Sequence, residues 1–355
     1  MQRDGQIALK IFLKHYRFMI PDEIINYEFS NIFTKEINDQ FLFPVDSFQL
    51  FLERLSINPF LFFKFWSDIN RQSIIHKHWG PNTKLDWKWS ISYPFFSLLE
   101  KYVHNSNQPK IIGFSGLPGS GKSTLGFWVN SVARDLGLDI KVISLDDFYL
   151  PGREMDLAMK GNPWNVPRGL PGSHSIDLLN QSLDTFLQSG VLRSPTFDKS
   201  LREGKGDRSG WCDCNPKVLI LEGWFVGCEP ISNLINIDNF NEDELDLALT
   251  QNEIQYRICI QESLAKYTNI WKKFDKTWHL KSNQFKNTIL WKKQQEEEMI
   301  KLKGSGLKGN NLIDFIRMIQ VSIPHESLSF INSDTTIEIN QDRRIINLNS
   351  NHYKF

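Results

Sequence analysis

The chain has few cysteines, no net charge and no long apolar run, and each of these absences excludes a class of protein. Four cysteines occur in 355 residues, and they are Cys212, Cys214, Cys228 and Cys259. The first two form C-x-C rather than C-x-x-C, without the nearby histidine that a zinc site of this kind needs. We therefore expect neither a zinc site nor a disulfide framework, but reduced thiols in a reducing compartment.

The charge balance and the lack of apolar runs point the same way. Lysine plus arginine and aspartate plus glutamate number 41 each, so no basic excess indicates a nucleic-acid partner. No stretch of about 18 uncharged apolar residues predicts a membrane span. The N-terminus carries Asp4 and has no apolar core that ends in small residues, so we expect no signal peptide. The sequence favours a cytoplasmic protein without a membrane partner, and no pattern specifies its oligomeric state.

A phosphate-binding motif is the most informative feature that is present. Residues 116–124 fit the pattern G-x-x-x-x-G-K-[ST], after a short apolar run at 111–114 and before a helical stretch at 125–136. In a strand–loop–helix context, backbone N–H groups turn around a phosphate chain, and the helix N-terminus adds about half a positive charge. The alternative is a glycine-rich turn before an ordinary helix. The residues expected to bind the nucleotide are Gly116, Leu117, Pro118, Gly119, Ser120, Gly121, Lys122, Ser123 and Thr124.

Residues 1–104 differ in texture from residues 105–355. They are rich in aromatic side chains and poor in glycine, and apolar residues recur at helical spacing in 50–55 and 60–66. We expect a helical N-terminal region of unknown role, followed by a P-loop domain. A wide aromatic stripe is more often core than ligand site, so we interpret these aromatic residues as core.

The rest of the chain alternates strands with helices. Strands are expected at 141–145, at 218–221, near Leu280 and, as one element, at 336–348; helices are expected at 176–187, 242–274 and 285–302, and glycine-rich loops at 151–175 and 194–210. This alternation predicts an α/β fold of the P-loop NTPase type, with a mostly parallel sheet and helices on both faces.

Acidic residues follow two of these strands. In an open parallel sheet, ligands bind beyond the carboxyl ends of the strands, so Asp146, Asp147 and Glu222 should converge on the P-loop. Asp146 is a candidate general base for a substrate hydroxyl, with Asp147 beside it or exchanging roles with it. Lys122 would reach the β- and γ-phosphates, and Ser123 with Glu222 would hold Mg²⁺. The alternatives are a helix N-cap pair for the two aspartates and a solvated carboxylate for Glu222.

Cations in two loops could bind an anionic substrate, although solvated loops have the same composition. They are Arg168 and His174 in the first loop, and Lys199, Arg202, Lys205 and Arg208 beside Asp198 in the second. The charged helix around 291–298 could close over ATP as a lid, or it could be a surface helix with salt bridges.

Several segments together are similar to the plant and cyanobacterial type of D-glycerate 3-kinase. This family belongs to the P-loop kinases that include phosphoribulokinase, uridine kinase and pantothenate kinase. The segments are GFSGLPGSGKSTL at 113–125, SLDDFYL at 144–150, NPWNVPRGLPGSHSIDLL at 162–179, FDKSLREGKGDR at 197–208, LILEGWFVG at 219–227, WKKQQEEEM at 291–299 and FIRMIQVSIP at 315–324. The first two are shared by many P-loop kinases, whereas the third to fifth are more particular to glycerate kinases.

The resemblance implies transfer of a phosphoryl group from ATP, with Mg²⁺, to the 3-hydroxyl of D-glycerate, as in photorespiratory glycolate salvage. It implies Asp146 as the base, Lys122 and Ser123 as ATP and Mg²⁺ ligands, and Glu222 as the second acidic residue. The residues assigned to the substrate are Asp147, Arg168, His174, Asp198, Lys199 and Arg208.

Two departures from the family pattern stand out. Phe197 replaces a common tyrosine, and Lys292 and Lys293 stand where the family tends to carry arginine.

Two other functions stay open. One is a P-loop kinase for a nucleoside, pantothenate or a sugar phosphate. The other is a nucleotide-binding regulator that works through its N-terminal region.

Overall fold

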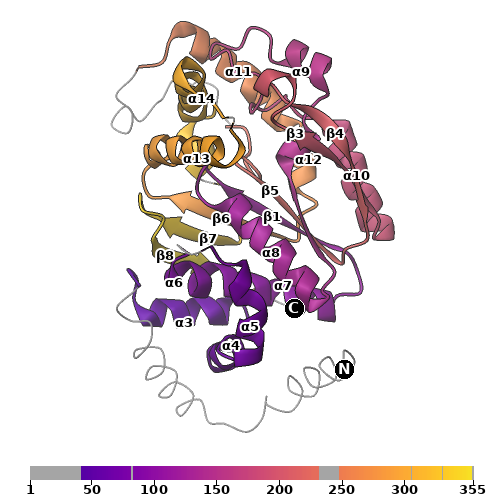
Figure 1. Ribbon diagram of the computed structural model, residues 1–355, viewed down its shortest axis with the longest axis vertical. Helices are drawn as coiled ribbons and strands as arrows, with labels where there is room; N and C mark the ends of the chain where they lie inside the picture. The colour runs from indigo at the N-terminus through magenta and orange to yellow at the C-terminus, as the bar shows by residue number, and fades with distance from the viewer. Residues whose placement is uncertain (1–40, 81–82, 232–247, 305, 330, 354–355) are drawn as a thin grey trace.

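A six-stranded sheet forms the centre of the molecule (Figure 1). The computed structural model describes residues 41–80, 83–231, 248–304, 306–329 and 331–353. The strand order is β2-β5-β1-β6-β7-β8, and every pair is parallel except β7 with β8. The strands are β1 (Lys110–Gly116), β2 (Ile140–Ser144), β5 (Val218–Gly223), β6 (Lys276–Ser282), β7 (Thr335–Ile339) and β8 (Ile345–Ser350). The α/β fold predicted from the sequence, with its mostly parallel sheet, is confirmed.

The central strands are apolar on both faces because helices cover both faces. All six residues of β5 are buried, as are residues 111–116 of β1. The register sets Phe114 of β1 and Ser144 of β2 level with Glu222 of β5. The carboxyl ends of these strands therefore lie at one edge of the sheet.

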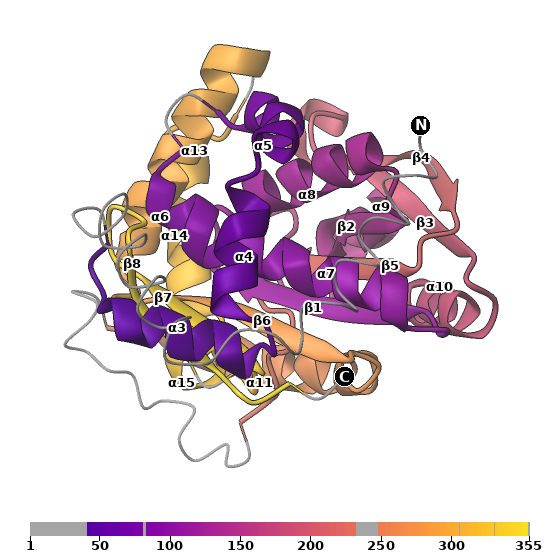
Figure 2. The same cartoon turned by 90° about the horizontal axis from the view of Figure 1, so that it is seen from below.

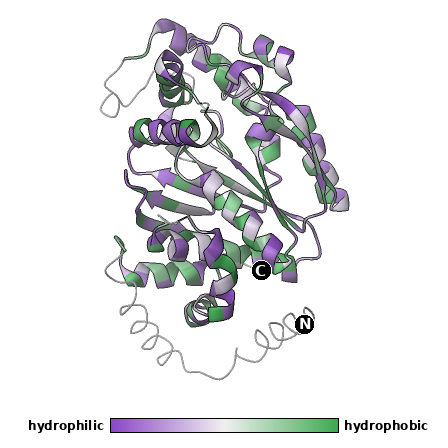
Figure 3. Ribbon diagram, viewed as in Figure 1, coloured by the Kyte–Doolittle hydropathy of each residue, from purple (hydrophilic) through white to green (hydrophobic). Residues whose placement is uncertain are grey.

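One face of the sheet carries the N-terminal helices and the helix that follows the P-loop (Figure 2). A single hydrophobic cluster joins them to alternate residues of the strands, such as Ile112 and Ile220. Figure 3 shows hydrophobic residues along the strands and on the helices that pack against them. These helices are α3 (Val45–Arg54), α4 (Pro59–Trp66), α5 (Ile69–Ile75), α6 (Leu85–Trp87), α7 (Tyr93–Asn105) and α8 (Lys122–Leu136).

A second cluster covers the opposite face through residues such as Ile111 and Leu219. The helices on this side are α9 (Gly152–Ala158), α10 (Ile176–Ser189), α11 (Gln251–Ala265), α12 (Thr268–Trp271), α14 (Gly309–Val321) and α15 (His325–Ser329). The charged helix α13 (Asn287–Lys303) lies at the end of the sheet beside α14. No helix within the described ranges is long and apolar enough to cross a membrane.

The N-terminal helices pack on the sheet through large aromatic rings. Trp66 stacks on Tyr93 with ring centroids 4.2 Å apart, and Phe51 and Phe95 contact Trp278 of β6 at 6.2 and 4.8 Å. Side-chain caps begin two of these helices: Asn58 accepts the N–H of Leu61 at the start of α4, and Asp68 accepts that of Arg71 at the start of α5, both at 3.0 Å. The described part of the N-terminal region is helical, as predicted, and shares its core with the sheet.

Residues 151–175, predicted to be a loop, contain the helix α9. Two further predicted elements differ from the structure. Residues 194–210, predicted to be a loop, form most of an antiparallel hairpin of β3 (Leu192–Asp198) and β4 (Asp207–Cys214). Residues 336–348, predicted to be one strand, form the antiparallel pair β7 and β8 with a turn between them. In both cases polar turn residues interrupt the alternation of apolar side chains, so the strand periodicity was hidden. Part of the helix predicted at 242–274, residues 242–247, lies outside the described residues.

Replacement of Trp278 by alanine tests the shared core. Trp278 is 1% exposed and contacts rings of both α3 and α7. We expect the free energy of unfolding to fall by about 3–5 kcal/mol, because the cavity removes contacts between the sheet and the N-terminal helices. Urea unfolding followed by circular dichroism measures it. Trp211→Ala is the control, since Trp211 of β4 is 48% exposed. Equal losses in the two variants would contradict a shared core.

Candidate nucleotide and acceptor site

The predicted P-loop connects β1 to α8. Strand β1 ends at Gly116 and α8 begins at Lys122, so the strand–loop–helix context expected from the sequence is confirmed. Gly119 and Gly121 have φ of +76° and +109°, a left-handed backbone that favours glycine. These turns leave the first N–H groups of α8 without helical partners, facing the space before the helix. Such a concavity of backbone donors suits a phosphate chain.

Neighbouring elements hold the loop closely from outside. A β-carbon at Gly119 would lie 2.7 Å from the β-carbon of Trp291 in α13, and one at Gly121 would lie 2.7 Å from Cη2 of Trp87 in α6. The guanidinium of Arg343, from the turn between β7 and β8, donates to the Gly119 carbonyl at 2.7 Å. Three distant parts of the chain therefore lie directly against the P-loop.

Lys122, Ser123 and Glu222 meet at the mouth of the loop, as the sequence predicted. Ser123 Oγ donates to Glu222 Oε1 at 3.0 Å, and Lys122 Nζ donates to the Leu117 carbonyl at 3.2 Å. Burial lowers the pKa of the Lys122 ammonium, and the carboxylates of Glu222 and Asp146 oppose this shift. A phosphate oxygen could take the place of the Leu117 carbonyl as the acceptor for Lys122 Nζ.

The pair of Ser123 and Glu222 also fits a magnesium ion. Mg²⁺ prefers hard oxygen donors and takes one or two carboxylates together with phosphate oxygens and waters. A hydroxyl and a carboxylate oxygen on one cavity wall match this donor set. Among the described residues there is no cluster of three or more His, Cys, Asp or Glu side chains that could enclose an ion by itself. The geometry thus suits an ion held jointly with a nucleotide.

The neighbouring residues Asp146 and Asp147 have different surroundings. They lie in a short 3₁₀ helix, residues 145–148, directly after β2. Asp147 Oδ2 accepts the N–H of Ser144 at 3.0 Å and completes a capping box. The Asp147 carboxylate is therefore engaged in a hydrogen bond to the backbone. Asp146 faces the cavity and forms an ion pair with Lys199 Nζ of the β3–β4 hairpin at 2.7 Å. The structure therefore separates the two predicted acids, with Asp146 alone on the cavity wall.

The ion pair controls the protonation of Asp146. Burial would raise the pKa of the Asp146 carboxyl, but the Lys199 ammonium outweighs burial and holds that pKa below its usual range. The Asp146 carboxylate in turn raises the pKa of Lys199. Both groups are therefore charged at neutral pH, and Asp146 is ionised and able to accept a proton.

Other residues predicted to bind substrate shape the loops around this pair. Arg168 Nη1 donates to the carbonyls of Gly204 and Lys205 at 2.6 and 2.8 Å. Arg208 Nε donates to the Tyr149 carbonyl at 3.1 Å. Asp198 accepts the N–H of Ser200 at 2.8 Å. These contacts fix the hairpin turn that carries Lys199, and the structure places none of the three side chains on the cavity wall.

His174 is also predicted to bind substrate, and the structure places it behind the wall. Its ring stacks on Tyr149 with centroids 4.5 Å apart, and Nδ1 lies 2.8 Å from the Tyr267 hydroxyl. Burial lowers the pKa of His174 to about 4 despite the Asp146 carboxylate, so the ring is neutral near pH 7. His174 therefore supports Tyr149, which does line the cavity.

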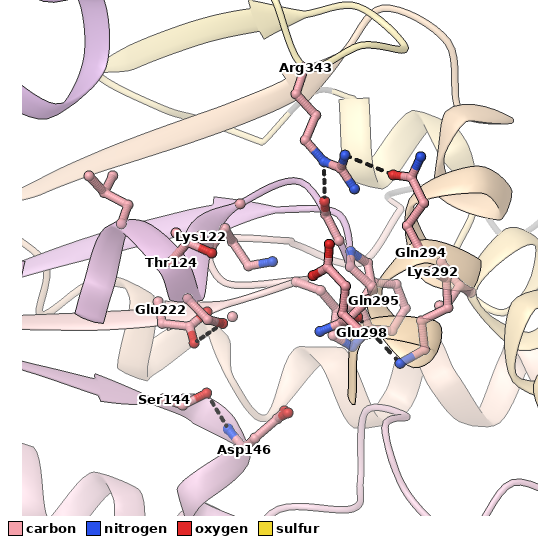
Figure 4. Close-up of a pocket in the computed structure, with 18 of the residues that line it drawn as sticks. Lys122, Thr124, Ser144, Asp146, Glu222, Lys292, Gln294, Gln295, Glu298 and Arg343 are labelled. Carbon is pink, nitrogen blue, oxygen red and sulfur yellow. Dashed lines mark hydrogen bonds between the residues drawn. The ribbon is translucent and has the colours of Figure 1, made fainter. Parts of the chain in front are cut away.

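One cavity of about 470 Å³ joins these groups (Figure 4). Lys122 and Glu222 lie on one side, and side chains of α13 lie opposite them. Beyond the P-loop, we call the end of the cavity that carries the Asp146–Lys199 ion pair the acceptor end, and to it we assign Gly169, Trp224, Phe315, Met318 and Ile319. The other end contains Trp79, Thr83, Lys84, Trp87, Asp342 and Arg343.

Helix α13, predicted as a possible lid, lines the cavity through Lys292, Gln294, Gln295 and Glu298. Lys292 pairs with Glu296 and lies 4.6 Å from the ring centroid of Phe315. Burial lowers the pKa of Lys292, and Glu296 opposes this shift. Residues 291, 294, 295 and 298 follow the three- and four-residue spacing of a helix, so they share one face of it. This spacing would have identified, from the sequence, the face of α13 that is turned to the cavity.

The residues that sequence reasoning missed lie at the other end of the cavity. Trp79 and Trp87 belong to the region interpreted as core, and Thr83 and Lys84 lie between them. Arg343 lies in a turn without a motif, and no local signal identifies it. It bridges the P-loop to α13, because Nη1 donates to Gln294 Oε1 at 2.9 Å (Figure 4).

The chain is similar in sequence to known kinases. No family model matches the chain. The uncharacterised kinase mug58 of Schizosaccharomyces pombe is 32% identical over 229 residues, which cover 61% of this chain and 81% of that protein. The chloroplastic D-glycerate 3-kinase of Arabidopsis thaliana is 28% identical over 234 residues, which cover 60% of this chain and 48% of that protein.

A solved structure shows the same fold. The D-glycerate 3-kinase from Cryptococcus neoformans var. grubii superposes with a TM-score of 0.59 at 24% identity. The match covers 72% of this chain and 97% of that chain.

Gly121→Ala tests the shape of the P-loop. Gly121 has φ of +109°, and the new β-carbon would lie 2.7 Å from the Trp87 ring. We expect affinity for MgATP to fall by about tenfold or more, because the loop must shift and its N–H groups then no longer point toward the phosphates. Isothermal titration calorimetry measures it.

Gly137→Ala is the matched control for this variant. Gly137 ends α8 with φ of +66°, and nothing lies within 4 Å of an added β-carbon. It should cost about 1 kcal/mol of stability and leave nucleotide affinity unchanged. A similar loss of affinity in both variants would show that the effect is not local to the loop.

Proposed function

This chain belongs to the family of P-loop kinases that includes the D-glycerate 3-kinases, and from this membership we propose that it phosphorylates the 3-hydroxyl of D-glycerate with ATP. The observation that carries the proposal is the pair of Asp146 and Lys199 on the cavity wall beside the P-loop, 2.7 Å apart. A carboxylate next to an ammonium suits a substrate that offers both a hydroxyl and a carboxylate. A cytoplasmic, photorespiratory role belongs to the same proposal.

The chain's own residues supply positioning and charge for the transfer. The P-loop amides hold the β- and γ-phosphates, and the Lys122 ammonium neutralises charge that develops on the transferred group. Ser123 and Glu222 would hold Mg²⁺, which supplies further positive charge when it is bound. Asp146 accepts the proton of the substrate hydroxyl as the oxygen–phosphorus bond forms and ADP leaves.

Lys199 is the residue we assign to the substrate carboxylate. Of the loop cations predicted from the sequence, all of them described, Lys199 alone lines the cavity; Arg168, Arg202, Lys205 and Arg208 do not. Arg202 pairs instead with Asp156 on α9. The substrate carboxylate would replace Asp146 as the partner of Lys199 and leave Asp146 free to face the hydroxyl.

Activity against an acceptor panel tests the substrate. We expect ADP release with MgATP for D-glycerate, with ³¹P NMR placing the phosphate on the 3-oxygen, and little release with L-glycerate, ribulose 5-phosphate, pantothenate or uridine. The aromatic residues Trp224 and Phe315 at the acceptor end make uridine the informative competitor. Asp146→Asn should lower kcat by about 10²- to 10⁴-fold while MgATP binding persists. Turnover of another acceptor alone would keep the kinase and reject D-glycerate.

The pH dependence of Lys199→Met tests the ion pair. Burial raises and Lys199 lowers the pKa of Asp146, so the pKa rises when the ammonium is removed. Asp146 must be ionised to accept a proton. As the pH is lowered, Lys199→Met should therefore lose activity at a higher pH than the unmodified chain does. We expect the acidic limb of log kcat/KM, which reports groups of the free enzyme, to move upward by about one pH unit or more. Steady-state kinetics at acceptor concentrations well below KM measure the shift.

Lys205→Met is the control for this profile. Lys205 lies in the same hairpin turn, is exposed and does not line the cavity. Its profile should match that of the unmodified chain. An unmoved limb in Lys199→Met would mean that Lys199 does not set the protonation of the base.

A further inference from the structure

We propose that the N-terminal region provides the base subsite of the nucleotide pocket, where a purine ring lies on the indole of Trp87. Trp79, Thr83 and Lys84 complete this wall, and Asp342 faces the same end of the cavity. The inference rests on the proposed function only in its need for a nucleoside triphosphate as donor, and not on the identity of the acceptor.

The position of the wall is the first observation. A triphosphate in the P-loop has its γ-phosphate toward Asp146 and Lys199, where the acceptor must approach. The base must therefore leave by the other end of the cavity, past Thr124 and Leu125 in the first turn of α8. Trp87 stands at that end, directly against Gly121 of the loop.

The rigidity of the wall is the second observation. Trp87 Nε1 donates to the carbonyl of Arg343, and Lys84 Nζ donates to that of Asp342 at 2.7 Å. Next to them, the carboxylate of Asp86, only 1% exposed, accepts from Arg344 Nε at 2.7 Å. Three residues of α6 and its N-cap, Lys84, Asp86 and Trp87, are thus joined to the β7–β8 turn. A surface fixed before binding loses little entropy when a ligand arrives.

The available ring surface is the third observation. Trp87 is half-buried and lines the cavity, whereas Trp79 stacks on Trp128 at 4.5 Å. Within the described ranges, no aromatic ring stacks on Trp87. A flat base can use this surface, because stacking on an aromatic side chain stabilises any base and a purine offers the larger face. The hydroxyl of Thr83, which also lines the cavity, would serve a ring nitrogen at the edge of the site.

The test separates base binding from support of the P-loop. We would titrate the full chain with MgATP and, separately, with magnesium tripolyphosphate, which has the phosphates but no base. Trp87→Ala should weaken MgATP binding by about tenfold or more and leave tripolyphosphate binding within about twofold. Trp87→Phe, which keeps a ring, should recover most of the loss. Trp211→Ala, an exposed tryptophan outside the cavity, should change neither.

Two results would overturn the proposal. Equal weakening of both ligands by Trp87→Ala would assign Trp87 to support of Gly121 alone, and an unchanged affinity for MgATP would remove it from the site. Because no acceptor is present, failure of D-glycerate as a substrate would not affect this outcome.

Photolabelling of the unmodified chain gives a result even where Trp87→Ala does not fold. With 8-azido-ATP, we expect the label on the tryptic peptides between His78 and Lys88, and excess ATP should prevent it. Labelling confined to other segments would reject the base subsite.

Discussion

The register between parallel strands β5, β1 and β2 is the constraint on which the rest of the site depends. Glu222 pairs with Phe114 on one side and Ser144 on the other. The P-loop therefore begins two residues beyond one partner, and Asp146 lies two residues beyond the other. A slip of one residue would turn Glu222 to the opposite face of the sheet and away from Ser123. Backbone hydrogen bonds, rather than side-chain contacts, thus set the spacing of the groups that carry chemistry.

Two lysines at the cavity are paired with carboxylates of the protein itself. Lys199 pairs with Asp146, and Lys292 pairs with Glu296. An anionic ligand would compete for these ammonium groups, and it would meet side chains that already lie in place. The hairpin β3–β4 and helix α13, which carry the two lysines, come from opposite sides of the cavity. Ligand binding would thereby couple two elements that do not belong to the sheet.

The residues that belong to local sequence patterns were predicted, whereas the residues that are positioned by contacts between distant segments were missed. The P-loop, Asp146 and Glu222 were placed correctly at strand ends because a motif and the parallel-sheet rule suffice. Asp147 and Arg168 looked like substrate ligands, but they hold backbone groups, and composition cannot distinguish these uses. The β7–β8 turn was missed because Arg343 adopts φ of +56° without the glycine that would announce it. Trp87 was taken for core, since its contact with Gly121 joins segments that the sequence keeps apart.

The contacts between the first helices and the last strand also affect how the protein is made. Trp87 and Arg343 are 256 positions apart, and the N–H of Tyr353 donates to the Arg54 carbonyl at 2.8 Å. On the ribosome, the aromatic helices emerge first and must wait for β8, while the surface they will bury stays open to water. Such non-local contacts slow folding and expose chains to aggregation. The surface of the N-terminal helices that packs on β8 should therefore stay exposed until β8 has left the ribosome.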